Sequence, residues 1–356
     1  MLVTDVARGP GSRLLNRLGD LCADRGLGGL SGRLLELGGL IGPDLGSLER
    51  SLGDTAWTDT VVGASARRLL ELGGKRLRPI CVMLAAKVGS GFDDAGLDLA
   101  VAAELTHNAT LLHDDVVDHA DSRRGAPSAR FLFGNAASIF AGDWLLVEAL
   151  KRVRRAAVPG TLEHLLDTIE EMIHAEALQL ENRGRLDAGA ELYFRVAEGK
   201  SASLFRWALD AGARAGGLGE EHCRALAAYG TQLGVAFQMI DDLLDLTGDV
   251  AATGKALFTD LREGKMTYPL IVAAERTPEL KKALERIAEV GADGDPDEAA
   301  FATVVDALHS SGAAAFSREV ASGYCARAVE ELAPLPDGVA TRALRTVAEA
   351  VIDRRS

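Results

Sequence analysis

The sequence predicts an all-α protein, and three observations carry this prediction. Aromatic residues make up only 5% of the 356 residues and prolines number 10, while Ala and Leu are abundant, a composition that favours helices over sandwiches and barrels. Apolar residues from Leu45 onward recur mainly at helical spacing. No run of alternating polar and apolar residues competes with that pattern. Hydrophobic residues make up 47% of the chain, so a disordered or collagen-like chain is excluded.

Helices are expected along most of the chain, between Gly- and Pro-rich turns. Residues 1–43 contain several breaks, including Gly38-Gly39 and Gly42-Pro43, so any helices there should be short, and we treat this segment as an N-terminal extension, partly ordered at most. Residues 44–356 are expected to form a single all-α domain. Helical spacing over residues 61–70 ends at Gly73-Gly74. The long helices are expected at approximately 79–90, 95–119, 135–156, 161–184, 189–213, 220–247, 266–275, 299–310, 315–333 and 337–354.

Composition also limits the function classes and the compartment. Asp and Glu outnumber Lys and Arg by 52 to 39, which argues against a nucleic-acid-binding surface because phosphate backbones need basic partners. The four cysteines show neither a CxxC pair nor a zinc-like spacing, as expected of thiols in a reducing compartment. Residues 1–13 carry charges where a signal peptide is apolar, and the longest uncharged stretch, 225–240, is too short for a span. We therefore expect a cytoplasmic protein without a membrane span.

Two aspartate clusters point to the chemistry. The pattern DDxxD occurs within LLHDDVVDH at Asp114, Asp115 and Asp118 and within FQMIDDLLDLTGD at Asp241, Asp242 and Asp245. Residues four apart share a helix face, so each pattern makes a two-carboxylate edge amid apolar neighbours. Two unit charges about 6 Å apart repel by roughly 3 kcal/mol at an effective dielectric of about 20, so six carboxylates in one cleft demand protonation or cations. Mg²⁺ suits them because it binds carboxylates, waters and phosphate oxygens together. The two clusters predict Mg²⁺ and a phosphorylated ligand.

Basic residues beside glycines supply the cationic partners that a diphosphate needs. Such groups occur in the segments GGKRLRP (73–79), RRG (123–125), GKS (199–201), GK (254–255) and GK (264–265). Each alone is weak evidence, since a Lys or Arg at a helix end is more often a dipole partner or a solvated charge. His107 lies seven residues before Asp114, within about 20° around the helix. It is either a core group or a donor to a phosphate, and the sequence leaves both open.

From about Leu45 to its C-terminus the chain resembles the trans-isoprenyl diphosphate synthases, or polyprenyl synthetases, and among them most the long-chain enzymes. The segments that carry the resemblance occur in the family's order and are GGKRLRP, HNATLLHDDVVDHADSRRG, GNAASIFAGDWLL, EGKSASLF, GVAFQMIDDLLD and LREGKMTYPL. The resemblance implies mostly antiparallel helices around a central cavity, a homodimer, and three Mg²⁺ ions that hold an allylic diphosphate between the aspartate clusters. It implies a prenyltransferase that condenses isopentenyl diphosphate head-to-tail (1′–4) with geranyl, farnesyl or geranylgeranyl diphosphate.

The resemblance also implies roles for the residues that match the family's motifs. Metal ligands would be Asp114, Asp118 and Asp241, with Asp115, Asp242 and Asp245 acting through water or as neighbouring anions. Residues that match the isopentenyl diphosphate site are Lys75, Arg78, His107 and Arg124. Residues that match contacts to the allylic diphosphate are Arg123, Lys200, Lys255 and Lys265, with Gln179, Ser201 and Gln238 as polar neighbours. The implied catalytic set, which stabilises charge on the departing diphosphate, is Asp114, Asp115, Asp118, Asp241, Asp242, Lys200 and Lys255. Ser201 stands where the family more often has Thr, and keeps the hydroxyl.

Small side chains before Asp114 set the expected product length. Family members with short products commonly place an aromatic residue four or five positions before the first aspartate, and here those positions hold Thr110 and Ala109. Ala103 lies on nearly the same face, about 16 Å deeper. We therefore expect a product longer than farnesyl, with long-chain polyprenyl diphosphate favoured and geranylgeranyl diphosphate second. In the alternative, a bulky residue of another helix, such as Phe140 or Trp144, closes the tunnel.

Other functions explain less of the sequence. Glu104 with His107, and Glu171 with His174, are ExxH pairs like those of di-iron oxidases, but an iron site would leave both DDxxD clusters without a purpose. A non-catalytic regulatory subunit of a heteromeric synthase would have lost part of a motif, and a terpene cyclase normally has a different second metal motif. Whether a second, different subunit joins the chain is left open.

Overall fold

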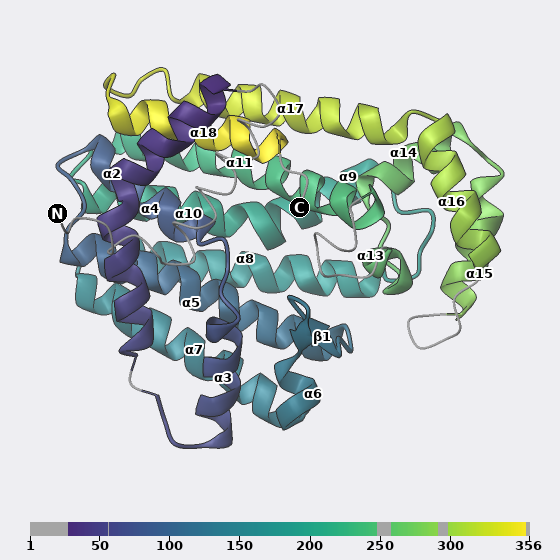
Figure 1. Ribbon diagram of the computed structural model, residues 1–356, viewed down its shortest axis with the longest axis horizontal. Coiled ribbons are helices and arrows are strands. Elements are labelled where there is room, and N and C mark those ends of the chain that lie inside the picture. The colour runs from purple at the N-terminus through teal and green to yellow at the C-terminus, as the bar shows by residue number, and fades with distance from the viewer. Residues whose placement is uncertain (1–27, 56, 248–257, 291–297, 354–356) are drawn as a thin grey trace, which may run out of the picture. The chain divides into compact units, whose positions relative to one another are not determined.

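The computed structural model describes residues 28–55, 57–247, 258–290 and 298–353, and 79% of these residues are helical (Figure 1). The strands found in these ranges are β1 (Ser122–Arg123) and β2 (Ala126–Pro127), which pair antiparallel. The prediction of an all-α fold is confirmed. None of the described helices combines the length and apolar character that crossing a membrane requires.

The chain divides into two compact units. The first comprises residues 1–166, 204–230 and 331–350, and the second comprises residues 167–203, 231–330 and 351–356. Helices α8 (Thr161–Glu181) and α11 (Glu220–Thr247) contribute residues to both units.

The first unit is built around a buried helix. Its helices are α2 (Gly28–Gly53), α3 (Val61–Glu71), α4 (Leu77–Val88), α5 (Asp94–Val117), α6 (Ala129–Phe133), α7 (Asn135–Ala156) and most of α10 (Ser203–Ala215) and α18 (Val339–Ile352). The Asp93 side chain caps α5 by accepting a hydrogen bond from Gly96 N. Leu99, Leu105 and Leu112 of α5 are fully buried, and α5 packs along α7 (Figure 1). The first aspartate cluster therefore extends from a rigid core helix.

Helix α2 differs from the sequence-based expectation. It runs without a break from Gly28 to Gly53, so the prediction that helices before residue 43 are short is wrong. The buried side chains recur at helical spacing and are Leu37, Ile41, Leu45, Leu48 and Leu52. Burial of this apolar face outweighs the low helix propensity of Gly38, Gly39 and Pro43. The predicted boundary at residues 43 and 44 falls inside α2, and residues 1–27 lie outside the described residues.

Glycines bring α4 and α10 to backbone contact. A Cβ atom added at Gly212 would lie 2.3 Å from the carbonyl oxygen of Val82, and one added at Gly216 would lie 2.5 Å from that of Ala86. Both distances are shorter than real carbon–oxygen contacts, so no larger residue fits without separating the helices.

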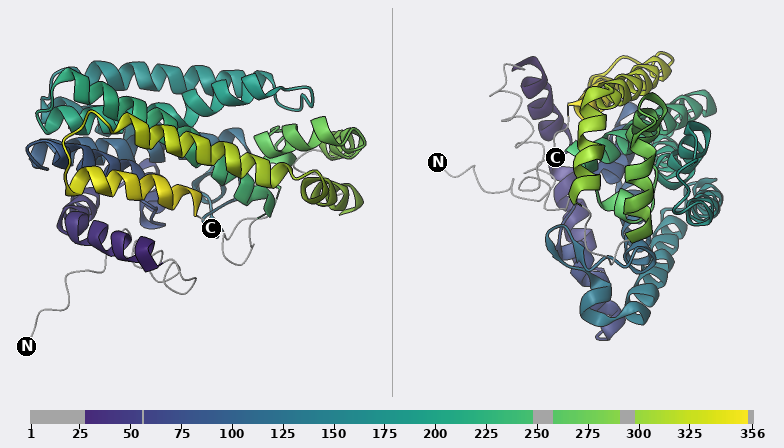
Figure 2. Two further views of the ribbon diagram at one scale, coloured as in Figure 1. Left: turned by 90° about the horizontal axis from the view of Figure 1, so that it is seen from above. Right: turned by 90° about the vertical axis from the view of Figure 1, so that its right-hand side faces the viewer.

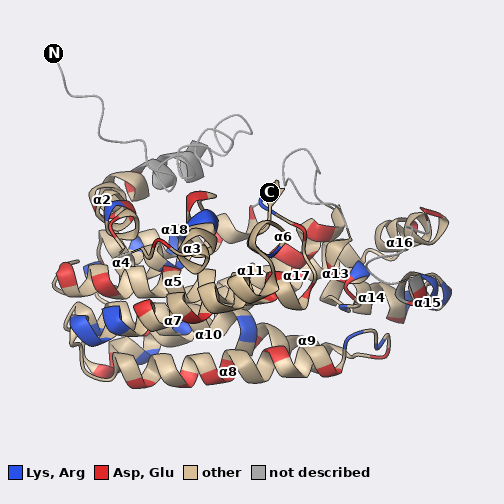
Figure 3. Ribbon diagram, turned by 90° about the horizontal axis from the view of Figure 1, so that it is seen from below, with Lys and Arg blue, Asp and Glu red and all other residues tan. Residues whose placement is uncertain are grey.

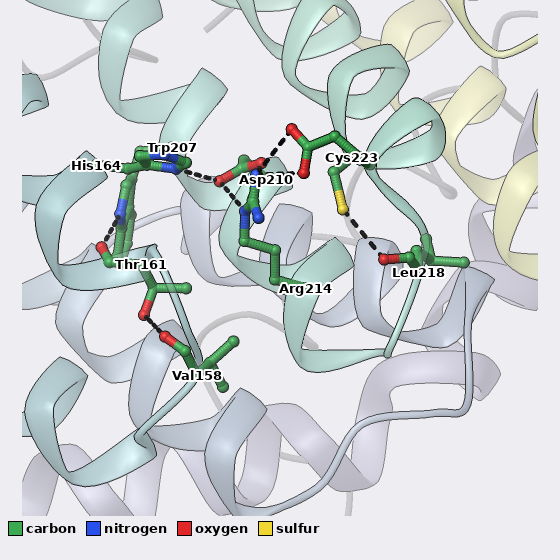
Figure 4. Close-up of polar contacts among 9 residues, drawn as sticks. Val158, Thr161, His164, Trp207, Asp210, Arg214, Leu218 and Cys223 are labelled. Carbon is green, nitrogen blue, oxygen red and sulfur yellow. Dashed lines mark hydrogen bonds and ion pairs between the residues drawn. The ribbon is translucent and has the colours of Figure 1, made fainter.

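A polar cluster joins the first turn of α8 to α10 (Figure 4). Asp210 Oδ2 lies 2.8 Å from His164 Nδ1 and accepts a hydrogen bond of 2.9 Å from Arg214 Nε. Trp207 Nε1, fully buried, donates to the carbonyl oxygen of Thr161 at 3.0 Å. These contacts satisfy buried polar groups and fix α10 against the first turn of α8.

The second unit holds the remaining helices. They are α9 (Ala190–Val196), the π-helical turn η1 (Ala197–Ala202), α13 (Thr259–Arg262), α14 (Tyr268–Arg276), α15 (Leu280–Val290), α16 (Glu298–Ser310) and α17 (Ala313–Glu331). Helices α15 and α16 lie side by side (Figure 2). The helix predicted at 189–213 is therefore interrupted by η1. The other long helices end within three residues of their predicted limits, whereas α15 lies where no long helix is predicted.

Candidate active site

The first aspartate cluster forms the C-terminal end of α5. Asp118 is the C-cap, and its N–H donates to the carbonyl oxygen of Asp114 at 2.8 Å. Asp114 and Asp118 are half-buried and one turn apart, while Asp115 is fully buried. The spacing thus produces the two-carboxylate edge that the sequence predicts, with the middle carboxylate turned into the protein.

A tight hairpin follows this cluster and places two arginines. Arg124 and Gly125 occupy its turn with φ of 54° and 74°, as the type I′ turn of a two-residue hairpin requires. Arg123 reaches back to Asp115 Oδ1, with Nε at 2.8 Å and Nη2 at 2.5 Å. Burial raises the pKa of Asp115, and Arg123 opposes that shift. The other oxygen, Oδ2, is buried and accepts no hydrogen bond within the described part of the chain.

The GGKRLRP loop meets the same hairpin. A Cβ atom on Gly74 would lie 3.2 Å from Arg124 Nη2 and 3.3 Å from Arg76 Nη1, so this glycine leaves room for two guanidinium groups. Arg78, in the first turn of α4, is buried with its guanidinium 4.6 Å above the ring of Phe205. Arg124 Nη1 is buried and finds no hydrogen-bond partner among the described residues. Such a group needs an anion or a polar ligand.

His107 lies in this positive environment. Desolvation, followed by the charges of Arg78, Arg124, Arg123 and Arg76, holds the pKa of His107 well below its usual value. The imidazole is therefore neutral at pH 7 and keeps one N–H donor. The charges of four arginines act on this neutral imidazole, an environment that suits an anion, and the donor role of His107 stays a prediction.

The second aspartate cluster lies on α11 in the second unit. Asp241 and Asp245 are half-buried, and Asp242 is buried. Asp242 Oδ1 accepts a 2.6 Å hydrogen bond from Gln238 Nε2, and Oδ2 accepts one of 2.6 Å from the hydroxyl of Tyr193. Burial, with Asp260 nearby, raises the pKa of Asp242 well above its usual value. Both oxygens of Asp242 therefore face protein donors.

Asp245 is also engaged by the backbone. Its carboxylate accepts hydrogen bonds of 3.3 Å from the N–H groups of Thr259 and Asp260, in the first turn of α13. Asp242 is thus held by side-chain donors and Asp245 by backbone donors, while Asp241 and Asp245 are the two partly accessible members of the cluster.

The turn η1 positions Lys200 and Ser201. Gly199 packs against α8, where an added Cβ atom would lie 2.7 Å from Ala175 Cβ. Lys200 Nζ donates to Gln179 Oε1 at 3.1 Å and forms an ion pair with Glu176, from a helix whose charged side chains are all acidic (Figure 3). The Ser201 hydroxyl donates to Gln238 Oε1, so the residue at the family's Thr position keeps a defined hydrogen bond. A π-helical turn at such a place is common at functional sites.

The remaining basic residues are less closely assembled. Lys265 Nζ forms a 2.6 Å ion pair with Glu263, beside Gly264, whose carbonyl oxygen accepts from Gly184 N at 2.8 Å. Lys255 lies outside the described residues. Within residues 28–55, 57–247, 258–290 and 298–353, no three His, Cys, Asp or Glu side chains converge on one metal position. Each unit holds one of the two aspartate clusters.

The residues expected to control product length lie on α5. Ala109 and Ala103 are fully buried, and the half-buried Thr110 donates its hydroxyl to the carbonyl oxygen of His107 at 2.8 Å. Of the bulky alternatives on α7, Phe140 is 60% exposed, and the Trp144 ring lies against that of Trp57 at 5.4 Å.

Several residues of the site escape sequence reasoning. Tyr193 approaches Asp242 across 49 positions, and Glu49 approaches Arg76 across 27 positions. Glu104, which the di-iron hypothesis makes a ligand, is instead buried against Arg76 at 2.5 Å. The only sequence signal for the Glu104–Arg76 pair is that Arg76 lies between Lys75 and Arg78 in the GGKRLRP motif.

Comparison with known proteins decides the family. Residues 59–306 match the family model described as polyprenyl synthetase. The chain belongs to the polyprenyl synthetase family. This membership confirms the resemblance and is incompatible with the di-iron hypothesis.

Relatives of known name cover most of the chain. The octaprenyl diphosphate synthase of Escherichia coli is 36% identical over 283 residues, which is 79% of this chain and 86% of that protein. The nonaprenyl diphosphate synthase of Mycobacterium tuberculosis is 33% identical over 297 residues, covering 83% of this chain and 88% of that protein. Both names denote long-chain members of the polyprenyl synthetase family.

Solved structures agree with the fold. A polyprenyl synthase from Caulobacter crescentus, complexed with calcium and isoprenyl diphosphate, superposes with a TM-score of 0.85 at 34% identity and covers 90% of this chain and 98% of that one. A decaprenyl diphosphate synthase from Rhodobacter capsulatus gives a TM-score of 0.81 at 32% identity, with the same coverage.

Proposed function

We propose that this chain condenses isopentenyl diphosphate head-to-tail with an allylic diphosphate and releases a trans-polyprenyl diphosphate. The observation that carries the proposal is the constellation at the end of α5. Half-buried Asp114 and Asp118 stand beside Asp115, whose partner Arg123 begins a cluster of four arginines around His107. Such adjacent acidic and basic groups suit two neighbouring diphosphates: the carboxylates bind one through metal ions, and the arginines bind the other directly.

The acidic groups fit Mg²⁺. The donors are carboxylate oxygens, which Mg²⁺ prefers, and Asp115 carries a buried oxygen without a hydrogen-bond donor in the described part of the chain. Mg²⁺, three ions per site by the resemblance, would be held by Asp114, Asp118 and Asp241 and would supply electrostatic stabilisation to the oxygens of the departing diphosphate.

Different residues of the chain bind the two substrate diphosphates. Arg78, Arg124 and the N–H of neutral His107, together with Lys75, bind isopentenyl diphosphate. Cationic contacts to the allylic diphosphate come from Arg123, Lys200, Lys255 and Lys265, with Gln179 as a polar neighbour. The hydrogen bonds from Ser201 to Gln238 and from Gln238 to Asp242 tie the Lys200 turn to the second aspartate cluster. Asp115, Asp242 and Asp245 act by holding these groups in place.

A long-chain product is proposed, with geranylgeranyl diphosphate as the second candidate. The helix before Asp114 offers Ala109 and Ala103, and no aromatic side chain, along its buried face. The names of the octaprenyl and nonaprenyl relatives support the same assignment.

A homodimer is also proposed. Large apolar side chains on α6 and α7 are exposed, and they are Phe131, Leu132, Ile139, Phe140 and Val147. Exposed apolar side chains gathered on neighbouring elements mark an interaction surface, and a second copy of this chain is the partner that the resemblance implies.

Product analysis tests the proposal. Purified full-length chain is incubated with labelled isopentenyl diphosphate and geranyl, farnesyl or geranylgeranyl diphosphate, with and without Mg²⁺, followed by dephosphorylation and chromatography. We expect Mg²⁺-dependent incorporation that Asp114→Asn lowers by about a hundredfold or more, because it removes a charge that cannot be replaced. No incorporation by folded wild-type chain with any primer would contradict the proposal and favour a regulatory subunit.

A further inference from the structure

Arg76 is held by two carboxylates from two different helices. It is 3% exposed, and its Nη1 donates to Glu104 Oε1 of α5 at 2.5 Å. Its Nε donates to Glu49 Oε1 of α2 at 2.9 Å, and Nη2 lies 3.3 Å from Glu49 Oε2. The guanidinium is therefore bound on two sides, and the contact to Glu49 is bidentate.

This clamp acts on the backbone of the GGKRLRP loop. Arg76 is the N-cap of α4 and adopts the left-handed conformation, with φ of 50° and ψ of 29°. A residue with a Cβ atom rarely adopts that conformation, and it persists where the surroundings over-determine it. Lys75 precedes Arg76 and Arg78 follows in the first turn of α4. The direction in which both side chains leave the loop therefore depends on the conformation of Arg76.

Glu104 alone does not account for the clamp. Its Oε1 atom also accepts a hydrogen bond of 3.0 Å from Asn108, and its charge acts on Arg124 as well as on Arg76. Two buried guanidinium groups beside one carboxylate would leave an uncompensated positive charge. Glu49 supplies the second carboxylate.

Helix α2 presents Glu49 from a fixed position. Leu37, Ile41, Leu45, Leu48 and Leu52 bury one face of this helix in the first unit. Residue 49 lies outside the segment 59–306 that matches the family model.

We infer that Glu49 is a positioning residue for the isopentenyl diphosphate site: by clamping Arg76, helix α2 sets the GGKRLRP loop in the conformation that directs Lys75 and Arg78 to the diphosphate. This inference rests on the proposed function. Glu49 acts on the diphosphate site through Arg76.

The test compares two matched substitutions on α2. Glu49→Ala and Asp44→Ala each remove one carboxylate that pairs with a cation of the α4 region, and the two side chains are similarly exposed, at 24% and 20%. In the Glu49→Ala chain we expect the KM for isopentenyl diphosphate to rise about tenfold, the size typical of a lost charged hydrogen bond, with little change in kcat or in the KM for the allylic substrate. In the Asp44→Ala chain all three constants should stay within about twofold of wild type, because its partner Lys87 lies in the last turn of α4, at the far end from the GGKRLRP loop. Glu49→Gln, which keeps one acceptor for Arg76 Nε, should restore part of the affinity.

The direction in which the KM for isopentenyl diphosphate changes distinguishes a positioning role of Glu49 from a general electrostatic effect of its charge. If Glu49 acted only through its negative charge, its removal would favour a diphosphate and the KM would fall. A KM for isopentenyl diphosphate that falls, stays level, or rises equally in the Asp44→Ala chain overturns the inference. Calorimetric titration of isopentenyl diphosphate into each chain gives a readout that does not need turnover. Wild-type chain that binds this ligand tightly but forms no product would contradict the proposed function alone, while weaker binding by Glu49→Ala would still support the inference.

Discussion

Removing the Tyr193 hydroxyl tests how the second aspartate cluster is held. In Tyr193→Phe the ring remains within its aromatic cluster with Phe194 and Tyr268, but Asp242 Oδ2 loses its 2.6 Å hydrogen bond. Asp242 is 3% exposed, so water cannot easily replace the lost donor. The substitution therefore leaves a buried acceptor unsatisfied next to Asp241.

The expected size follows from that geometry. Leaving a buried acceptor unsatisfied costs about 1–3 kcal/mol, and a tenfold change in rate corresponds to about 1.4 kcal/mol. If about half of that cost, about 0.5–1.5 kcal/mol, falls on the transition state because Asp241 moves, kcat drops about twofold to twelvefold. Tyr229→Phe is the matched control, since that buried hydroxyl donates at 2.7 Å to the carbonyl oxygen of Leu344, away from both aspartate clusters.

The assay measures kcat at saturating substrates and Mg²⁺ for the two variants, with the midpoint of thermal unfolding for each. We expect both variants to unfold at a somewhat lower temperature and only Tyr193→Phe to lose kcat. The reasoning is refuted if the two variants lose kcat to the same extent, because the effect would then follow from stability rather than from the placement of Asp241. Full kcat in Tyr193→Phe would equally show that the hydrogen bond to Asp242 does not position the cluster.

Three further outcomes are expected. Ala109→Phe should shorten the product, at a packing cost of about 1–3 kcal/mol, and an unchanged chain-length distribution by chromatography would remove Ala109 from the tunnel. Phe140→Asp should convert the proposed dimer to monomer in light scattering, because it places a charge in an exposed apolar cluster, and a persistent dimer would locate the interface elsewhere. Burial raises the pKa of Cys81 and of Cys325 to about 12, so at pH 8 only about one thiol in ten thousand is ionised; both should resist alkylation in the native chain and react after unfolding, as mass spectrometry of peptides can show.

Local sequence patterns predicted the parts of the fold and site that depend on local spacing. Apolar residues at helical spacing located α5, α7 and α11, and the DDxxD spacing placed Asp114 and Asp118 on one edge. Composition misjudged α2, since its glycines and proline are outweighed by the tertiary burial of leucines that no local pattern reveals.

Local sequence patterns could not predict the long-range contacts. The pairs Tyr193–Asp242 and Glu49–Arg76 join helices far apart in the chain, and nothing in either local sequence requires the other partner. Nothing in the local sequence indicates that Asp242 is buried while Asp241 and Asp245 stay partly accessible. Such differences between chemically identical residues arise from burial and from neighbours supplied by other helices.

The contact between α4 and α10 limits which substitutions the sequence can accept during evolution. Gly212 and Gly216 face carbonyl oxygens at distances that exclude any Cβ atom, and α4 carries the loop that ends in Arg78. A methyl group at Gly212 or Gly216 would displace the loop, so we expect substitutions at these two positions to be selected against, even though neither glycine is proposed to bind a substrate. Gly38 and Gly39 of α2 have no atom within 4 Å of an added Cβ and remain open to exchange. Libraries aimed at new chain lengths or at heat resistance can therefore vary Gly38 and Gly39 and should leave Gly212 and Gly216 unchanged.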